Sequence, residues 1–398
     1  MKRLLGIVSL LTLALVISLP FSAGAAGKGK SAPAPDPAVQ PAPEPAPAVQ
    51  PAPEPAPAVQ PAPTPEPPKG SGVMVGIGDM KISGILQAYF TLAQTQVGNA
   101  TDGYDTELNN SFTFRRARIF LMGSILPDKV KYVFQGDAAN DGSLSGNTTD
   151  GYKFTPNPWL LDARLIFVNA LPQTEIQVGR FLPNFTYYMP QLVSKLDFAE
   201  YPLLTSKYAM WRQVGIQSTT KLGITSLNVG IYNSVSQNCQ NTWKDADNWK
   251  DFLLRLNIKP NDKIETAVYA TFGETGVTGT SDYLMGIRAG AFLRATVSGL
   301  TALAEILYAM DESDPDNING IVVYGQAGYK VVPKVEPMVR VEYYEPNLDA
   351  DNDQTIRLTG GINYYIIGTN AMLSLNAVED LKDPENLFTL YTQAQVAF

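Results

Sequence analysis

The feature that most constrains this chain is an alternation of apolar and polar residues that recurs from about Met80 to the C-terminus. The last stretch, residues 388–398 (FTLYTQAQVAF), shows it clearly: Leu390, Val396 and Phe398 share one parity, and polar residues dominate the other. Because side chains of opposite parity point to opposite faces of a strand, this strand has one apolar and one polar face. A soluble sandwich could contain such a strand, whereas a barrel wall between lipid and a polar lumen requires it.

The apolar residues are spread too thinly for membrane-spanning helices. After the N-terminal segment, the sequence has no run of about 18 apolar residues, which is what a transmembrane helix needs. A closed barrel is the other structure that satisfies every backbone polar group in lipid. If the chain spans a membrane, we therefore expect an all-β, antiparallel transmembrane barrel.

Sixteen alternating segments separated by turn chemistry predict a sixteen-stranded barrel. The expected strands cover about 80–94, 111–125, 129–138, 160–169, 174–181, 211–219, 225–234, 250–258, 263–272, 282–293, 299–309, 318–331, 335–344, 355–367, 371–380 and 387–398. Short connections near Pro127, Pro172, Gly223, Asn261, Ser298, Pro333 and Thr369 alternate with longer ones over 95–110, 139–159, 182–210, 235–249, 273–281, 310–317, 345–354 and 381–386. An even number of strands places both ends of the domain on the same side, which we expect to be the periplasm.

The first 70 residues do not resemble the rest. Residues 1–25 combine Lys2 and Arg3, an apolar stretch and a small-residue site ending at Ala25, which predicts a cleaved secretory signal peptide. Residues 26–70 form a Pro/Ala-rich linker with a ten-residue repeat that begins at Ala38 and again at Ala48. Dense proline favours polyproline II, so this disordered periplasmic arm is either an inert tether or a contact to the cell wall. The barrel domain is expected over 71–398.

Composition excludes several classes of function. The chain has no histidine and a single cysteine, which removes the usual general base, thiolate metal clusters and covalent haem motifs. We therefore expect no cofactor, no metal site and no enzymatic activity. A net charge of −8 argues against a nucleic-acid partner.

Strand parity assigns a set of charged residues to the lumen. Arg255, for example, lies between Leu254 and Leu256, and a basic side chain facing lipid would cost about 2–4 kcal/mol at mid-depth. The expected pore-lining residues are Arg116, Arg118, Asp137, Asp162, Arg164, Arg255, Arg288, Glu305, Arg340, Glu342 and Arg357. Arginine would attract anions, unless these residues only pair with acids across the wall. Acidic loops, such as the one with Asp349, would favour cations, so the sequence leaves the sign of ion selectivity open.

The longest connection, about residues 182–210, is too apolar and aromatic for a free surface loop. Folding into the barrel would make it a constriction, with Lys195, Asp197, Glu200 and Lys207 near the narrowest point; a lid or a subunit contact is the alternative. Trp159, Trp211 and Trp249 each begin an expected strand at the end with the long connections, which predicts an aromatic girdle there.

Several short motifs resemble the phosphate-selective porin O and P family. They are Phe114-Arg115-Arg116-Ala117-Arg118 with the strand–turn–strand through Pro127 to Asp137, and Asp162-Ala163-Arg164 followed by Val178-Gly179-Arg180-Phe181 before the long connection. The resemblance covers about residues 80–398. It implies a trimeric, sixteen-stranded outer-membrane porin of a Gram-negative bacterium, with the inserted loop as constriction. The strands carry few lysines, unlike the dense basic ladder of the phosphate-selective members.

The expected function is a passive outer-membrane diffusion channel for small hydrophilic solutes or ions, with anions or phosphate among the candidates. The alternative is a structural or scaffold barrel that anchors the envelope through its proline-rich arm or sheathes a partner protein. The partners expected are outer-membrane lipid, two further copies in a homotrimer, and the barrel assembly machinery through the C-terminal aromatic Phe398.

Overall fold

The computed structural model describes residues 78–99, 103–126, 129–139, 160–233, 249–274, 285–312, 316–382 and 385–398. The expected signal peptide, the proline-rich arm and Trp159 lie outside these ranges. Among the described residues, no helix is long and apolar enough to cross a membrane.

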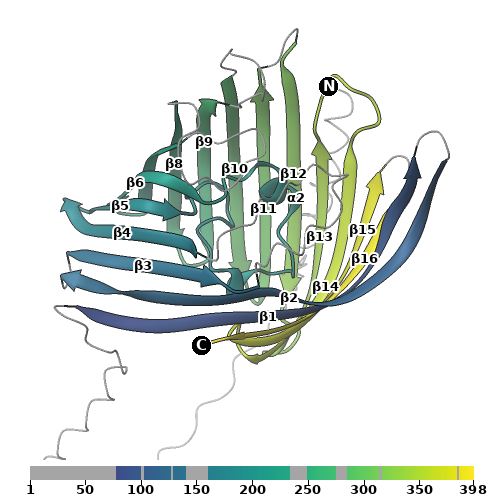
Figure 1. The fold of residues 1–398 in the computed structure, drawn as a ribbon, viewed down its shortest axis with the longest axis horizontal. Coiled ribbons are helices and arrows are strands. Elements are labelled where there is room, and N and C mark those ends of the chain that lie inside the picture. Colours follow the sequence, from purple (N-terminus) through teal and green to yellow (C-terminus); the bar gives the residue numbers. More distant parts are fainter. Residues whose placement is uncertain are drawn as a thin grey trace, which may run out of the picture. The chain divides into compact units, whose positions relative to one another are not determined.

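Sixteen antiparallel strands close into one barrel, in which each strand pairs with its neighbours in sequence and β1 pairs with β16 (Figure 1). The expected sixteen-stranded antiparallel barrel is confirmed. The strands are β1 (Asp79–Asn99), β2 (Gly103–Leu126), β3 (Val130–Asp137), β4 (Leu160–Leu171), β5 (Thr174–Phe181), β6 (Gln213–Leu222), β7 (Thr225–Asn233), β8 (Lys250–Asn261), β9 (Ile264–Glu274), β10 (Met285–Val297), β11 (Leu300–Asp311), β12 (Ile318–Tyr329), β13 (Val335–Glu345), β14 (Thr355–Ile367), β15 (Ala371–Lys382) and β16 (Leu387–Ala397).

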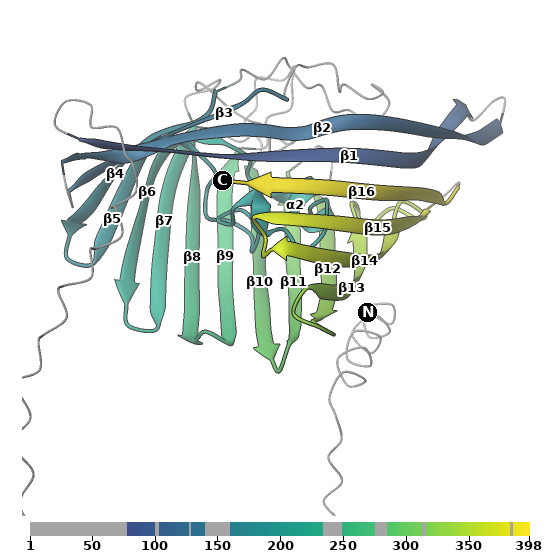
Figure 2. The ribbon, with the colours of Figure 1, turned by 90° about the horizontal axis from the view of Figure 1, so that it is seen from below.

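The two ends of the barrel differ in their connections. Short turns such as β6–β7, β8–β9 and β10–β11 lie along one edge, seen at the bottom of Figure 2. We call this end, where β1 begins and β16 ends, the turn rim, and the opposite end the loop rim. Proline or glycine and residues with positive φ make these turns, for example Gln173 (φ 58°) and Ser298 (φ 49°).

The barrel closes between the first and last strands. The Gly84 amide donates to the Phe398 carbonyl at 2.9 Å, and the Phe398 amide donates back to the Gly84 carbonyl at 3.0 Å. A Cβ atom on Gly84 would lie 2.5 Å from the Phe398 ring, so the absence of a side chain lets the terminal aromatic lie against β1. No edge strand is left in the sheet.

Alternation separates a lipid face from a lumen face, as the sequence predicts. On β16, Val396 is 54% exposed and Gln395 is 3% exposed. On β8, Leu254 is 54% exposed, whereas the guanidinium-bearing Arg255 is 4% exposed. The apolar side chains therefore cover the outside of the barrel and the polar ones fill the inside.

The expected long connection over 95–110 is wrong. β1 and β2 continue as a ribbon, with pairs out to Asn99↔Gly103. Its polar composition resembles a loop, but alternation continues, and cross-strand contacts such as Asn109 Nδ2 to Thr95 Oγ1 (2.7 Å) join the two strands. Pairing with β16 ends at Ala93, so this ribbon extends past the neighbouring strand.

Strict alternation also fails at two positions near the loop rim. Trp211, expected to begin a strand, precedes β6 and packs on Tyr201, with ring centroids 5.5 Å apart. Leu161 shares the parity of the lipid-facing Leu165 but is 3% exposed, because a register shift between Gln135 and Gly136 disturbs parity at the start of β4. Trp249 is 48% exposed beside β8, as a girdle residue should be.

Candidate functional site in the barrel lumen

The connection between β5 and β6, residues 182–212, lies within the ring of strands (Figures 1 and 2). We call it the inserted segment. It contains a 3-10 turn, η2 (Val193–Lys195), and one short helix, α2 (Leu203–Tyr208). Most of its aromatic and aliphatic side chains are buried, and Phe185 and Leu204 are completely so. The apolar character of this stretch is therefore explained by packing inside the barrel.

Local sequence determines where the helix begins and ends. Pro202 occupies the N-cap position of α2 with extended backbone (φ −64°, ψ 158°), and proline fits a helix start because it has no amide to leave unpaired. Leu203 and Leu204 follow and turn into the core. The helix ends at Tyr208, and the amide of its C-cap residue, Ala209, donates to the Thr205 carbonyl at 3.2 Å.

A buried carboxylate on β11 anchors the segment to one wall. Glu305 Oε1 accepts hydrogen bonds from the Tyr187 amide (2.8 Å) and the Tyr269 hydroxyl (2.7 Å), and Oε2 accepts one from the Tyr324 hydroxyl (2.7 Å). On β8, Arg255 Nη1 donates to the Thr186 carbonyl at 2.9 Å. Both side chains are therefore covered by the inserted segment and hold its backbone by hydrogen bonds.

A second set of contacts joins the segment to β13 and β15. Arg340 on β13 pairs with Glu342 at 2.8 Å, and Glu342 also accepts the Leu203 amide of α2. Asn376 on β15 accepts the Ala199 amide at 2.7 Å. These hydrogen bonds occupy the otherwise unpaired backbone groups of an irregular segment.

The four charged residues expected at the constriction have different surroundings. Asp197 Oδ2 accepts from the Tyr188 hydroxyl (2.8 Å) and Gln326 Nε2 (2.6 Å), and burial raises the pKa of its carboxyl. Lys207 lies 5.5 Å from the centre of the Tyr344 ring. The remaining two are Lys195, which is exposed, and Glu200, which faces an arginine of β2.

That arginine is Arg115, which parity would place on the lipid face. A β-bulge alters the parity: Gln87 pairs with Arg116 and Ala88 with Phe114, so Arg115 has no partner across the strand pair. Arg115 Nε donates to Glu200 Oε1 at 2.7 Å and its Nη2 to Oε2 at 3.2 Å. Burial alone would raise the pKa of the Glu200 carboxyl, but the charges of Arg115 and Arg116 outweigh it and hold the pKa below its ordinary value.

The neighbouring arginines of β2 also face inward. Arg118 pairs with Asp137 of β3 at 2.8 Å. Arg116 Nη1 donates to Gln87 Oε1 at 2.7 Å, and its guanidinium lies 5.6 Å from the centre of the Tyr201 ring. The first motif of the sequence therefore contributes three guanidinium groups to the lumen.

Arg180 and Arg212, which are absent from the sequence-based set, also lie in this part of the lumen. Arg212 pairs with Asp162 at 2.6 Å and interacts electrostatically with Arg118, Arg164 and Arg180. Arg164 Nη1 donates to Gln177 Oε1 at 3.2 Å, and Arg180 Nη1 donates to backbone carbonyls of β4.

Arg180 was missed because it shares parity with the lipid-facing Val178. Gly179 between them has φ +128°, a conformation that redirects the chain, and a Cβ there would lie 2.2 Å from the Ala163 carbonyl oxygen. The glycine in Val-Gly-Arg-Phe is the one sequence signal that could have found it. Five arginines thus share this part of the lumen with two carboxylates: Arg116, Arg118, Arg164, Arg180 and Arg212 with Asp137 and Asp162.

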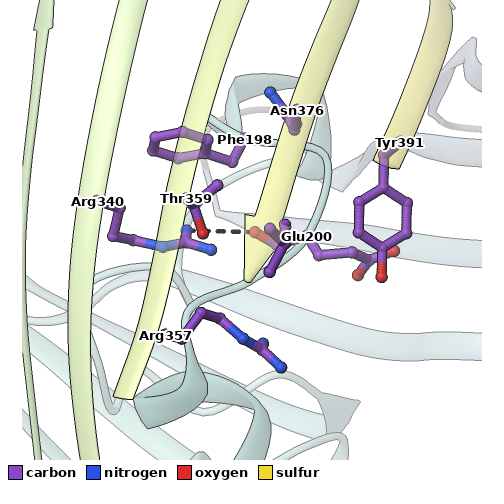
Figure 3. A pocket seen from close by; sticks show the side chains of 8 residues that line it. Phe198, Glu200, Arg340, Arg357, Thr359, Asn376 and Tyr391 are labelled. Atoms are coloured by element: carbon purple, nitrogen blue, oxygen red, sulfur yellow. Dashed lines mark hydrogen bonds between the residues drawn. The ribbon is translucent and has the colours of Figure 1, made fainter. Parts of the chain in front are cut away.

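The last expected lumen residues pair near the loop rim. Arg288 pairs with Asp311 at 2.7 Å, and Arg357 Nη2 donates to Asp380 Oδ2 at 2.7 Å. Arg357 also borders a pocket that Figure 3 shows between β13–β16 and the inserted segment. In this pocket the Glu200 side chain extends toward Tyr391, and the Glu200 carbonyl accepts a 3.4 Å hydrogen bond from Arg340 Nη1.

Comparison with solved structures agrees with this architecture. The anion-selective porin from Comamonas acidovorans has a TM-score of 0.59 at 13% identity, covering 81% of this chain and all of that one. OmpT of Vibrio cholerae has a TM-score of 0.58 at 8% identity, with 82% and 100% covered. OmpF of Salmonella typhi, solved with daunomycin, has a TM-score of 0.53 at 12% identity, with 82% and 100% covered. No protein with a curated description matches the sequence.

The fold is that of the outer-membrane porins, whose barrels present an apolar outer surface to membrane lipid. Residues 87–250 match the family model of phosphate-selective porin O and P.

Proposed function

We propose that small hydrophilic anions cross this porin by passive diffusion along a polar path between the inserted segment and the wall formed by β1, β2 and β14–β16. One observation carries the proposal: charged side chains on this side of the segment remain partly exposed to solvent. The side chains of Arg115, Glu200, Arg357 and Asp380 are 42%, 26%, 22% and 17% exposed. Carboxylates and guanidiniums of this kind hold the hydration water that a permeating ion exchanges.

The preference for anions rests on the arginine excess near β2–β6. Seven charged side chains there include only two carboxylates, so the local potential is positive. In a lumen of reduced dielectric, such a potential favours anions over a longer range than it would in bulk water.

We also propose the sidedness and assembly that the sequence predicts. The turn rim, with the start of β1 and with Phe398, faces the periplasm, in agreement with the short turns of outer-membrane barrels. The chain assembles as a homotrimer and is inserted by the assembly machinery that recognises the C-terminal aromatic. A trimer form of Vibrio cholerae OmpT with a TM-score of 0.54 supports the assembly by likeness of fold.

Single-channel recording in planar bilayers tests the function. Purified protein should produce discrete conductance steps, and a salt gradient should give a reversal potential of the sign for anions. Silent bilayers, from protein whose mobility on unheated gels shows a folded barrel, would instead favour a scaffold barrel. A reversal potential of the opposite sign would overturn the anion preference alone.

A further inference from the structure

The two rims of the barrel carry opposite charge. Within three residues of a strand end, or in the connection itself, the described turn rim has nine basic and five acidic side chains. Lys259 and Lys263 flank the β8–β9 turn, and Lys330 and Lys334 flank the β12–β13 connection. Most lysines among the described residues lie at this end.

Lysines of the regular strands at this rim lie at lumen-facing rather than lipid-facing positions. Lys131 has the parity of the buried Gln135 on β3, and Lys221 has the parity of the buried Gln217 on β6. The Lys330 ammonium group lies 5.5 Å from the centre of the Tyr365 ring, which belongs to β14. The basic groups therefore surround the mouth of the lumen.

The opposite mouth is acidic on the same half of the barrel. The described residues of the β11–β12, β13–β14 and β15–β16 connections contain no lysine or arginine. Their carboxylates are Glu312, Asp316, Asp349, Asp351, Asp353 and Glu385. The conflicting charge signals of the sequence, basic strands and acidic loops, thus belong to two ends of one pore.

A pore with fixed charges of opposite sign at its two mouths conducts unequally in the two directions of voltage. When the loop rim is positive, cations enter through the acidic mouth and anions enter through the basic mouth, so both accumulate inside. When the loop rim is negative, both are drawn out and the lumen is depleted. The effect requires a screening length comparable with the mouth, which is about 10 Å at 0.1 M salt and about 3 Å at 1 M.

We propose that this porin is a rectifying channel, in which the lysines of the turn rim, called here the lysine ring, and the carboxylates of the loop rim make current larger when the loop rim is positive. The property rests on the proposed conduction function and adds a direction to it. The permeant species that benefit are small anions entering from the side of the turn rim.

The experiment is a current–voltage curve of single channels in symmetric salt. At about 0.05 M salt we expect currents of opposite polarity to differ by about two-fold or more, and at about 1 M salt we expect the ratio to approach one, because screening then removes the fixed potentials. Orientation is fixed with Ser298→Cys in the β10–β11 turn and Cys239→Ser elsewhere. A polyethylene-glycol maleimide too large to enter the pore blocks current only from the chamber that the turn rim faces.

Substituting lysines of the lysine ring tests whether fixed charge, rather than the shape of the pore, causes the asymmetry of current. The variant Lys259→Gln/Lys263→Gln/Lys330→Gln/Lys334→Gln should lose most of the asymmetry at low salt, and each pair of changes alone should lose part of it if the fourfold variant fails to fold. The matched control, Lys250→Gln/Lys382→Gln, removes two lysines at the loop rim and should keep or increase the asymmetry.

A conducting wild-type channel with equal currents in both directions at low salt would overturn rectification and leave the proposed function intact. An asymmetry that the ring substitutions leave unchanged, or that persists undiminished at high salt, would also overturn it. Silent bilayers would instead contradict the proposed function.

Discussion

Arg115 and Glu200 join the barrel wall to the inserted segment by two parallel hydrogen bonds, at 2.7 Å and 3.2 Å. A planar guanidinium and a carboxylate matched in this way form charge-assisted hydrogen bonds, each about twice as strong as one between neutral groups. With 42% and 26% of these side chains exposed, the pair borders water rather than a dry core. Its two members should therefore have opposite effects on permeating ions.

Neutralising one member should expose the charge of the other. We expect Glu200→Gln to raise the anion-to-cation permeability ratio about two-fold, since an uncompensated unit charge near the path contributes about 0.5–1 kcal/mol after screening. Arg115→Gln should lower the ratio by a similar factor. Reversal potentials in a salt gradient measure both. Equal shifts in the same direction for the two variants would contradict this account.

Closure of the barrel should depend on the small size of residue 84. Gly84→Val would place a side chain where Phe398 Cζ lies 2.5 Å and the Arg118 carbonyl oxygen 2.9 Å from a Cβ atom. We expect less folded barrel, measured as the fraction that migrates faster on unheated than on heated gels. Gly360→Ala on β14 is the control, because nothing lies within 4 Å of its Cβ position. Equal folding of the two variants would show that the contact does not limit closure.

Removing the Glu305 carboxylate should loosen the inserted segment. Three buried donors lose their acceptor in Glu305→Ala, and each unpaired group costs about 1–3 kcal/mol. We expect lower thermal stability, noisier conductance and faster chymotrypsin cleavage within 182–212. Glu305→Gln keeps an acceptor oxygen and should fall between this variant and the wild type.

A matched control for that experiment is Glu175→Ala, which removes a carboxylate from the turn rim. It should leave the cleavage rate of the inserted segment unchanged. If the two alanine variants are cleaved at the same rate, Glu305 is not the anchor.

The alternation of apolar and polar residues was sufficient to predict the barrel, its strand number and the inward direction of Arg255, because lipid on one face leaves each regular strand a single orientation. Prediction failed where the backbone leaves that regularity. The bulge at Arg115, the positive φ of Gly179 and the register shift before Leu161 each change which face a side chain reaches. Polar β-structure in the ribbon beyond Ala93 was mistaken for a loop for a related reason: composition does not distinguish a solvated strand from a turn.

The contacts of the inserted segment could not be predicted from the sequence. Its apolar composition indicated burial, but the partners of Glu305 and Glu342 are backbone amides of the segment, and any residue type could supply them. No periodicity relates residues separated by more than 100 positions. In the structure, these two carboxylates, which we expected to line the channel, anchor the inserted segment.

Asp197 should make stability depend on pH in an unusual direction for a carboxylate. Burial raises the pKa of its carboxyl; Glu336 adds to the effect, and Arg294 and the hydrogen bonds from Tyr188 and Gln326 oppose it. Because the folded state binds the proton more tightly than the unfolded chain, whose carboxyl has a pKa of about 3.9, the contribution of Asp197 to stability is greatest at low pH and falls as pH rises through the folded-state pKa.

The variant Asp197→Asn isolates this contribution, since an amide keeps the shape and cannot ionise. We expect the difference in unfolding temperature between Asp197→Asn and wild type to grow as pH rises from about 4 toward neutrality and then to level off, because titration of groups that do not interact with Asp197 cancels in the difference. Asp349→Asn, in an exposed connection of the loop rim, should show no such trend. A difference that shrinks with rising pH would mean that the Asp197 carboxylate is stabilised as an anion, which would contradict the effect of burial.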